Sequence, residues 1–135
     1  MRAFEANLAE SDDPRHVVVI SSILARIGVP GYSGYSASKA GLLGLVRSFA
    51  AEWAPRNVLV NAICPGWVET DMAWLGLDAT GLQREEAYAQ AMAHVPLGRM
   101  AQPEEIAGTV AWLFSDDARS ITGQAIDQNG GDFML

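Results

Sequence analysis

The 135-residue sequence has few of the features that cross-link or anchor a chain. It contains a single cysteine, Cys64, so no disulfide can form within the chain, and a reducing compartment such as the cytoplasm is expected. No run of apolar residues comes near the roughly 20 that cross a bilayer. The first ten residues carry two glutamates and no apolar segment, which is unlike a secretory signal. We therefore expect no membrane partner.

Positive charge is also scarce. Lysine and arginine together number 9, against 16 aspartates and glutamates, which gives a formal net charge of −7. An acidic surface repels phosphate backbones, so a nucleic-acid partner is not expected. All but one of the basic residues are arginines, and Lys39 is the single lysine.

The overall composition is that of a globular protein. Half of the residues are apolar and 19% are charged, with a mean hydropathy of +0.10. This balance excludes a disordered chain, and the length fits one small domain over residues 1–135. The paired carboxylates of the sequence are typical of solvated helix ends, so no metal site is expected.

Apolar residues follow two different spacings along the chain. Continuous β-branched runs are typical of strands, and the first of these runs predicts a strand that is buried on both faces. The predicted strands are residues 16–20, 58–63 and 124–127. Spacings of three and four are typical of helices, which are predicted at residues 35–54, 82–93 and 103 to about 116. The buried stripe predicted for the first helix is Leu42, Leu45, Val46 and Phe49.

The order of these elements predicts an α/β fold. A strand, a long helix and a second strand form a βαβ unit, which implies parallel strands joined by a right-handed crossover. Parallel sheets need cover on both faces and at both edges, and three strands supply little of it. We therefore expect further strands from upstream of this sequence or from a partner chain.

Polar residues with catalytic potential gather at one predicted edge of the sheet. Ligands of open α/β sheets bind outside the carboxyl ends of the strands, which is where Ser22 follows the first strand. Tyr35 and Lys39 begin the crossover helix at the same edge, and residues four apart are neighbours on a helix. An ammonium group beside a phenol favours the phenolate, so this pair can act as acid and base. Pairs with this spacing are common in helices, so a purely structural role stays open.

Three segments occur in a fixed order around these residues. Ser22 lies thirteen residues before Tyr35, the sequence Tyr35-Ser-Ala-Ser-Lys39-Ala-Gly follows, and Val60-Asn-Ala-Ile-Cys-Pro-Gly-Trp-Val-Glu-Thr70 comes after the helix. The pattern closely resembles the short-chain dehydrogenase/reductase family, and most closely its β-ketoacyl-carrier-protein reductase-like and sugar or steroid dehydrogenase-like members. The resemblance implies part of a Rossmann-type, doubly wound parallel sheet. It also implies an oxidoreductase that uses NAD or NADP to interconvert a small-molecule carbonyl and a secondary alcohol.

The resemblance implies a role for each matching residue. Tyr35 would be the general acid and base, Lys39 would stabilise its phenolate and hold the nicotinamide ribose, and Ser22 would polarise the substrate carbonyl. Ser21 is the competing candidate for the last role. The segment along the cofactor would comprise Pro65, Gly66, Val68 and Thr70. Residues 72–95 match the substrate lid of the family, and the candidate pocket residues there are Trp74, Leu75 and Tyr88.

Several features of the family have no counterpart in the sequence. The glycine-rich dinucleotide fingerprint, the Asn-Asn-Ala-Gly segment and the residue that selects NAD or NADP are absent, and the family's catalytic asparagine would precede residue 1. Residues 1–7 match the tail of the helix that carries this asparagine. The sequence therefore resembles the carboxyl-terminal half of such an enzyme. Two functions stay open: an oxidoreductase, or a truncated, non-catalytic subunit that associates with its own copies or with a complementary chain of the family.

Overall fold

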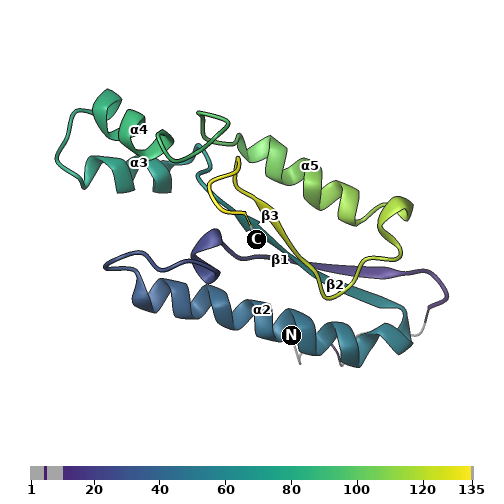
Figure 1. Cartoon of the computed structure of the whole chain (residues 1–135). Coiled ribbons are helices and arrows are strands. Elements are labelled where there is room, and N and C mark those ends of the chain that lie inside the picture. The colour runs from purple at the N-terminus through teal and green to yellow at the C-terminus, as the bar shows by residue number, and fades with distance from the viewer. Residues whose placement is uncertain (1–4, 6–10, 135) are drawn as a thin grey trace.

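The computed structural model describes residue 5 and residues 11–134, which Figure 1 shows as strands and helices. In chain order the elements are β1 (Arg15–Ile20), the 3-10 helix η1 (Ile23–Ala25), α2 (Ser33–Trp53), η2 (Ala54–Arg56), β2 (Val58–Pro65), α3 (Asp71–Asp78), α4 (Arg84–Met92), α5 (Pro103–Leu113), η3 (Asp116–Ala118) and β3 (Ala125–Gln128). All the predicted strands and helices are present, and their ends differ from the predictions by a few residues. The predicted helix tail at residues 1–7 lies outside the described residues except for Glu5, which is helical.

The three strands form one parallel sheet in the order β1-β2-β3. Val17 of β1 lies beside Val60 of β2, and Ile63 of β2 lies beside Ile126 of β3. The chain passes through α2 between β1 and β2, and through α3, α4 and α5 between β2 and β3. This arrangement confirms the predicted α/β class and the βαβ unit.

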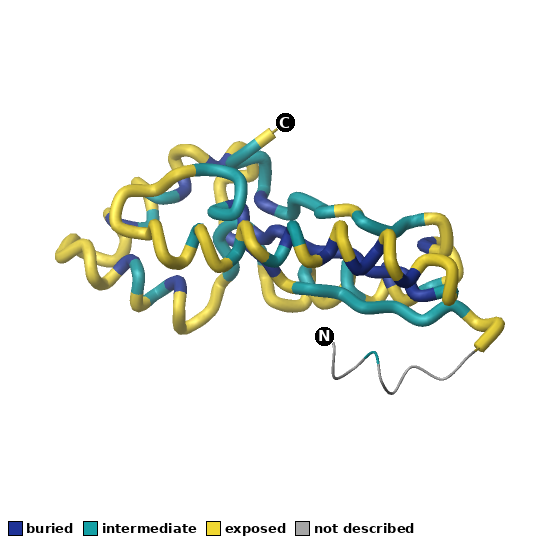
Figure 2. Tube along the Cα trace, turned by 90° about the horizontal axis from the view of Figure 1, so that it is seen from below, coloured by how far each residue is buried: buried dark blue, intermediate teal, exposed yellow. Residues whose placement is uncertain are grey.

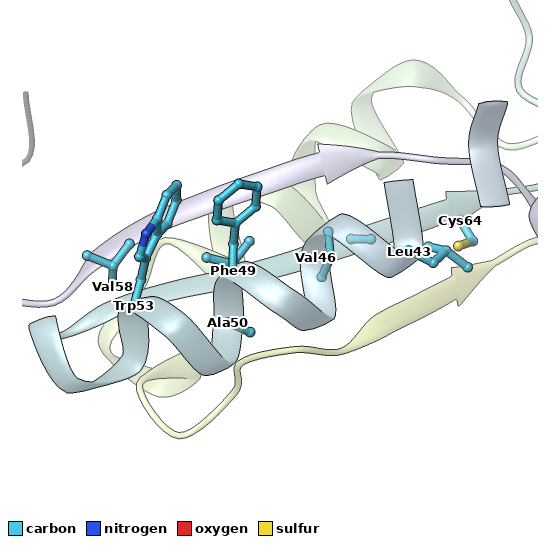
Figure 3. Close-up of a cluster of buried hydrophobic side chains, with 9 residues drawn as sticks. Leu43, Val46, Phe49, Ala50, Trp53, Val58 and Cys64 are labelled. Atoms are coloured by element: carbon cyan, nitrogen blue, oxygen red, sulfur yellow. The ribbon is translucent and has the colours of Figure 1, made fainter. Parts of the chain in front are cut away.

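The helix α2 covers one face of the sheet with a continuous apolar side. The side chains that pack against β2 from this helix recur every three or four residues, as Figure 3 shows, and they are Leu43, Val46, Phe49, Ala50 and Trp53. The ring centroids of Phe49 and Trp53 lie 4.3 Å apart. The predicted stripe is wrong at Leu45, whose exposed fraction is 46%. Each residue turns a helix by about 100°, so the inward direction falls on Leu43 and Val46 instead.

The helix α5 covers the opposite face, as Figure 1 shows, so the sheet is the middle of three layers. Ile63 and Leu113 are fully buried on this side. The partly buried residues around them come from α5, from both outer strands and from the loop before β3, and they are Val18, Ile106, Val110, Ile121 and Ile126.

Only the central strand is buried along its whole length. All eight residues of β2 are buried, whereas β1 and β3 are half-buried, a contrast that can be followed in Figure 2. The prediction that the first strand is buried on both faces is therefore wrong, and Ile20 at its end is 43% exposed. β2 has a strand on each side and a helix on each face, whereas β1 is an outer strand of the described sheet.

Two short helices, α3 and α4, form a separate cluster near the carboxyl ends of the strands (Figure 1). The buried residues of this cluster are Ala73, Leu77, Ala87, Met92, Val95 and Met100. The sequence did not predict α3, because eight residues that include Gly76 are too few for a clear helical period. Among the described residues, no helix is long and apolar enough to cross a membrane.

The start of α5 is held by a capping box and an ion pair. The carboxylate of Glu105 accepts two hydrogen bonds from Arg99, at 2.7 and 2.8 Å, and a third from the backbone N–H of Gln102 at 2.7 Å. The bonds from Arg99, followed by the one from Gln102, lower the pKa of Glu105 from 4.5 to about 2. The ionised form of Glu105 therefore stabilises the folded chain.

We expect the free energy of unfolding to decrease between about pH 5 and about pH 2, in part through Glu105. A carboxylate whose pKa is lower in the folded state stabilises the fold above its unfolded pKa, and this stabilisation is lost as the pH falls through the folded value. Urea denaturation at the two pH values should give a smaller difference for Glu105→Gln than for the wild type. Glu104→Gln is the control and should keep the wild-type difference; the same difference in both variants would contradict the prediction.

Candidate active site

The turn that follows β1 lies at the carboxyl ends of the strands. The N–H of Ser21 donates to the carbonyl oxygen of Ile63 at 2.7 Å, which extends the pairing with β2 by one residue. Ser22 then caps η1, because its Oγ accepts a hydrogen bond from the N–H of Leu24 at 3.1 Å. The next residue, Ile23, is only 3% exposed, so its side chain packs in the interior and holds the turn in place. Ser22 therefore lies at the predicted edge of the sheet.

The first two turns of α2 bring Tyr35 and Lys39 to the same edge. The Nζ of Lys39 lies 5.6 Å from the centroid of the Tyr35 ring and donates to the carbonyl oxygen of Ile20 at 3.1 Å. The bond to Ile20 ties the lysine to the end of β1 and uses one of its three N–H donors. Tyr35 is 39% exposed, so its ring is accessible to a ligand.

The hydroxyls of Ser21 and Ser22 are engaged in different ways. Ser21 Oγ donates its single hydrogen to the carbonyl oxygen of Lys39 at 2.9 Å, inside the protein. Ser22 Oγ accepts a hydrogen bond from Leu24, which leaves its own hydrogen available for a ligand. Of the two serines, Ser22 is therefore the one that can donate to a substrate oxygen.

The predicted cofactor segment leaves β2 at this edge too. Pro65 is the last residue of β2, and Gly66 follows it. Val68 forms a parallel bridge with Ala101, and Thr70 caps α3 with its hydroxyl. The structure therefore arranges these residues along one path from the sheet to α3, with the Thr70 side chain in a capping role.

The candidate pocket residues of the lid region have two different environments. Trp74 and Tyr88 stack on each other, with 5.9 Å between ring centroids and an angle of 19° between the rings. Both belong to the cluster between α3 and α4, and the guanidinium of Arg84 lies 5.4 Å from the Trp74 ring. Leu75, by contrast, is 69% exposed. The structure thus joins Trp74 and Tyr88 and places Leu75 apart from them, on the surface.

Two surface cavities occur elsewhere on the described chain. One, of about 320 Å³, lies at the opposite ends of the strands, where Arg15, Arg56 and Asn57 contribute to its wall. The other, of about 160 Å³, lies near the end of β3 and is lined in part by Trp67 and Gln128. Ser22, Tyr35 and Lys39 line neither cavity. Tyr35 is exposed, Lys39 is half-buried and Ser22 is only 8% exposed.

Cys64 lies in β2 with no exposed area and packs in the cluster below α2. Burial raises the pKa of its thiol, against the opposing effect of the nearby Arg26 guanidinium. A buried thiol that stays protonated is a packing group and not a nucleophile. The single cysteine is thus a core residue.

The sequence matches one family model over nearly its full length. The model, described as enoyl-(acyl carrier protein) reductase, covers residues 1–132. The chain belongs to the short-chain dehydrogenase/reductase family. It is 46% identical over 117 residues to the 3-oxoacyl-(acyl-carrier-protein) reductase FabG of Aquifex aeolicus, and 41% identical over 115 residues to that of Thermotoga maritima. These matches cover 87% and 85% of this chain but 44% of each relative, so the chain spans less than half the length of these curated relatives.

Solved structures of the same family share the fold. A short-chain dehydrogenase family protein from Francisella tularensis superimposes with a TM-score of 0.87 at 32% identity, over 97% of this chain and 55% of that protein. An actinorhodin polyketide ketoreductase variant with NADPH gives a TM-score of 0.83 at 38% identity, over 87% of this chain and 47% of the ketoreductase. The three-stranded sheet and its helices are therefore part of a Rossmann-type α/β fold.

One long-range ion pair at this edge was not predicted from the sequence. Arg26, at the end of η1, binds Asp127 of β3, 101 residues away. No local pattern marks such a pair, because each partner alone is an ordinary charged residue near a strand end. Only the register of β2 and β3 brings them together.

Gly66→Ala tests whether the backbone must approach closely at the end of β2. A Cβ at Gly66 would lie 2.9 Å from the backbone Cα of Asn129 and 2.9 Å from its Cβ, and neither atom can easily move. We expect the variant to lose about 1–3 kcal/mol of unfolding free energy through this overlap. Gly108→Ala is the matched control, because nothing lies within 4 Å of its Cβ position on α5.

The control should gain about 0.5–1 kcal/mol from the higher helix propensity of alanine. Urea denaturation of both variants at neutral pH measures the two changes. A Gly66→Ala variant as stable as the wild type would show that this close approach does not constrain the chain.

Proposed function

We propose that the chain carries the catalytic part of an NAD(P)-dependent oxidoreductase, which transfers hydride between a nicotinamide and a carbonyl or secondary alcohol. The observation that carries the proposal is the Lys39 ammonium group 5.6 Å from the centroid of the Tyr35 ring, at the edge where Ser22 caps η1. Ligands of open α/β sheets bind at this edge.

Each of the three side chains has a distinct part in the proposed reaction. The Ser22 hydroxyl donates a hydrogen bond to the substrate carbonyl oxygen and polarises it. The Tyr35 phenol gives its proton to that oxygen as the hydride reaches the carbonyl carbon, and it takes the proton back in the oxidative direction. Lys39 provides a positive charge that stabilises the phenolate left on Tyr35. Its bond to the carbonyl oxygen of Ile20 keeps the ammonium group in place.

The described residues fit the nicotinamide end of such a cofactor. The remaining N–H donors of Lys39 suit ribose hydroxyls, and the tight contact of Gly66 with Asn129 keeps the path of Pro65, Gly66, Val68 and Thr70 close to the sheet. The bound nicotinamide would supply or accept the hydride. The glycine-rich turn that holds a pyrophosphate has no counterpart in the sequence. A comparison of NADH and NADPH binding distinguishes the two cofactors.

The substrate we propose is a 3-oxoacyl thioester or a related small-molecule ketone. Support comes from the FabG relatives at 41–46% identity and from the ketoreductase neighbour at 38%. The exposed Met72 and Leu75 of α3 offer apolar surface near the carboxyl ends of the strands.

A second candidate function is association with a complementary chain of the family, or with further copies of this chain, without catalysis by the chain alone. The half-buried β1 favours it, because parallel sheets are normally covered at their edges and on both faces.

The first test is a titration of the purified chain with NADH and with NADPH, followed by tryptophan fluorescence. It is carried out alone and with the recombinant amino-terminal part of the Aquifex aeolicus reductase that the match leaves uncovered. The oxidoreductase proposal predicts saturable binding and turnover of a 3-oxoacyl thioester in at least one of these two samples. Binding only in the mixture would favour the requirement for a complementary chain, and absence of both activities would contradict the proposed reaction.

Tyr35→Phe is expected to abolish turnover in the active sample, by a factor of about 100 or more, because the proton donor is lost. Nucleotide binding should change little, since the phenyl ring remains. Tyr32→Phe is the matched control: Tyr32 lies next to Tyr35, with 6.4 Å between ring centroids, and is 48% exposed. Turnover by Tyr35→Phe at the rate of Tyr32→Phe would show that Tyr35 is not the proton donor.

A further inference from the structure

A partly buried ion pair joins the turn that carries Ser22 to the last strand of the sheet. Arg26 Nε donates to Asp127 Oδ1 at 2.7 Å, and Arg26 Nη2 donates to the carbonyl oxygen of Ala125 at 2.9 Å. The two charged side chains are 19% and 22% exposed. Solvent screens such a pair less than it screens the exposed ion pairs of this chain.

The guanidinium reaches across the end of the central strand. Asp127 lies beside Cys64 of β2 in the sheet register, and the charge of the nearby Arg26 opposes the rise in the pKa of the Cys64 thiol. Ser22 and Arg26 are the two caps of the same short helix: Ser22 begins η1, and the N–H of Arg26 closes it on the carbonyl oxygen of Ile23 at 2.8 Å. Hydrogen bonds that fix the Arg26 side chain to β3 therefore also restrict the conformation of η1, which Ser22 begins.

The residues that follow η1 are not packed against the interior and do little to fix the turn. Residues 28–35 are all exposed, and this loop leads directly to Tyr35. At the start of η1, Ile23 is buried, and before it Ser21 bonds to Ile63 and to the backbone of α2. At the other end of the turn, the two bonds from the Arg26 side chain connect it to β3.

We infer that Arg26 and Asp127 are positioning residues for Ser22: their ion pair holds η1 against β3, so that the Ser22 hydroxyl stays at the carboxyl edge of the sheet. The inference rests on the proposed function, since it assigns a role to the pair through Ser22. Neither Arg26 nor Asp127 takes part in proton transfer. A displacement of a catalytic hydroxyl by even about 1 Å is enough to lower turnover strongly.

Asp127→Asn tests the pair, because it removes the charge and keeps the size of the side chain. Amide hydrogen exchange, followed by NMR on the full chain, reads the turn directly at the N–H groups of Leu24, Ala25 and Arg26. Their exchange should become about tenfold faster, the size expected when a charge-assisted hydrogen bond is lost. The N–H of Ala62 in β2 should keep its wild-type rate.

Two further variants separate the local effect from a general loss of stability. Arg26→Lys keeps the charge but not the second bond to β3, so its exchange rates should lie between those of the wild type and of Asp127→Asn. Asp116→Asn is the matched control, because it removes an exposed ion pair with Arg119 at the far end of α5. It should leave the exchange of η1 unchanged. Equal acceleration in Ala62 and in η1, or no acceleration in η1, would overturn the inference.

Turnover is measured in whichever sample is active, the chain alone or the mixture with the amino-terminal part of the Aquifex aeolicus reductase. It tests whether the pair of Arg26 and Asp127 acts through Ser22. Asp127→Asn should lower kcat about tenfold with little change in KM for the nucleotide, and it should have no further effect in a Ser22→Ala background. A loss of the same size in both backgrounds would show a general structural role and overturn the inference. If the wild-type chain is inactive in every sample, the proposed function fails, while the exchange rates still decide whether the pair holds the turn.

Discussion

The burial of β2 is the constraint on which the rest of the structure depends. All eight residues of this strand are buried, and each of its faces needs an apolar helix. Residues 58, 60, 62 and 64 face α2, and Ile63 faces the side covered by α5. Because consecutive side chains of a strand point in opposite directions, one strand organises both outer layers.

This constraint also determines where the candidate active site lies. A right-handed crossover between β1 and β2 must leave from the carboxyl end of β1, so α2 begins at that edge and runs back along the sheet. Tyr35 and Lys39 are placed by the start of the helix, and Ser22 is placed by the end of the strand. Two bonds then join these parts: Lys39 Nζ to the carbonyl oxygen of Ile20, and Ser21 Oγ to the carbonyl oxygen of Lys39.

The comparisons relate this fold to longer proteins of the same family. Family membership and the shared fold place the chain within the short-chain dehydrogenases and reductases, of whose length it spans roughly half. The proposed acid–base residues lie on α2, and the proposed nicotinamide segment follows β2, while no glycine-rich turn for the pyrophosphate occurs in the sequence.

The sequence by itself determined the class of fold and the strands and long helices, and it predicted Ser22, Tyr35 and Lys39 as candidate site residues. Those features are local: they depend on apolar spacing, on capping residues and on motifs within a few turns of chain. Only the tertiary structure decided that β1 is half-buried, that Leu45 faces outward, and that Arg26 meets Asp127. These outcomes depend on which strands are neighbours and on the direction in which a packed helix is turned, and such long-range contacts leave no mark on the spacing of residues along the chain.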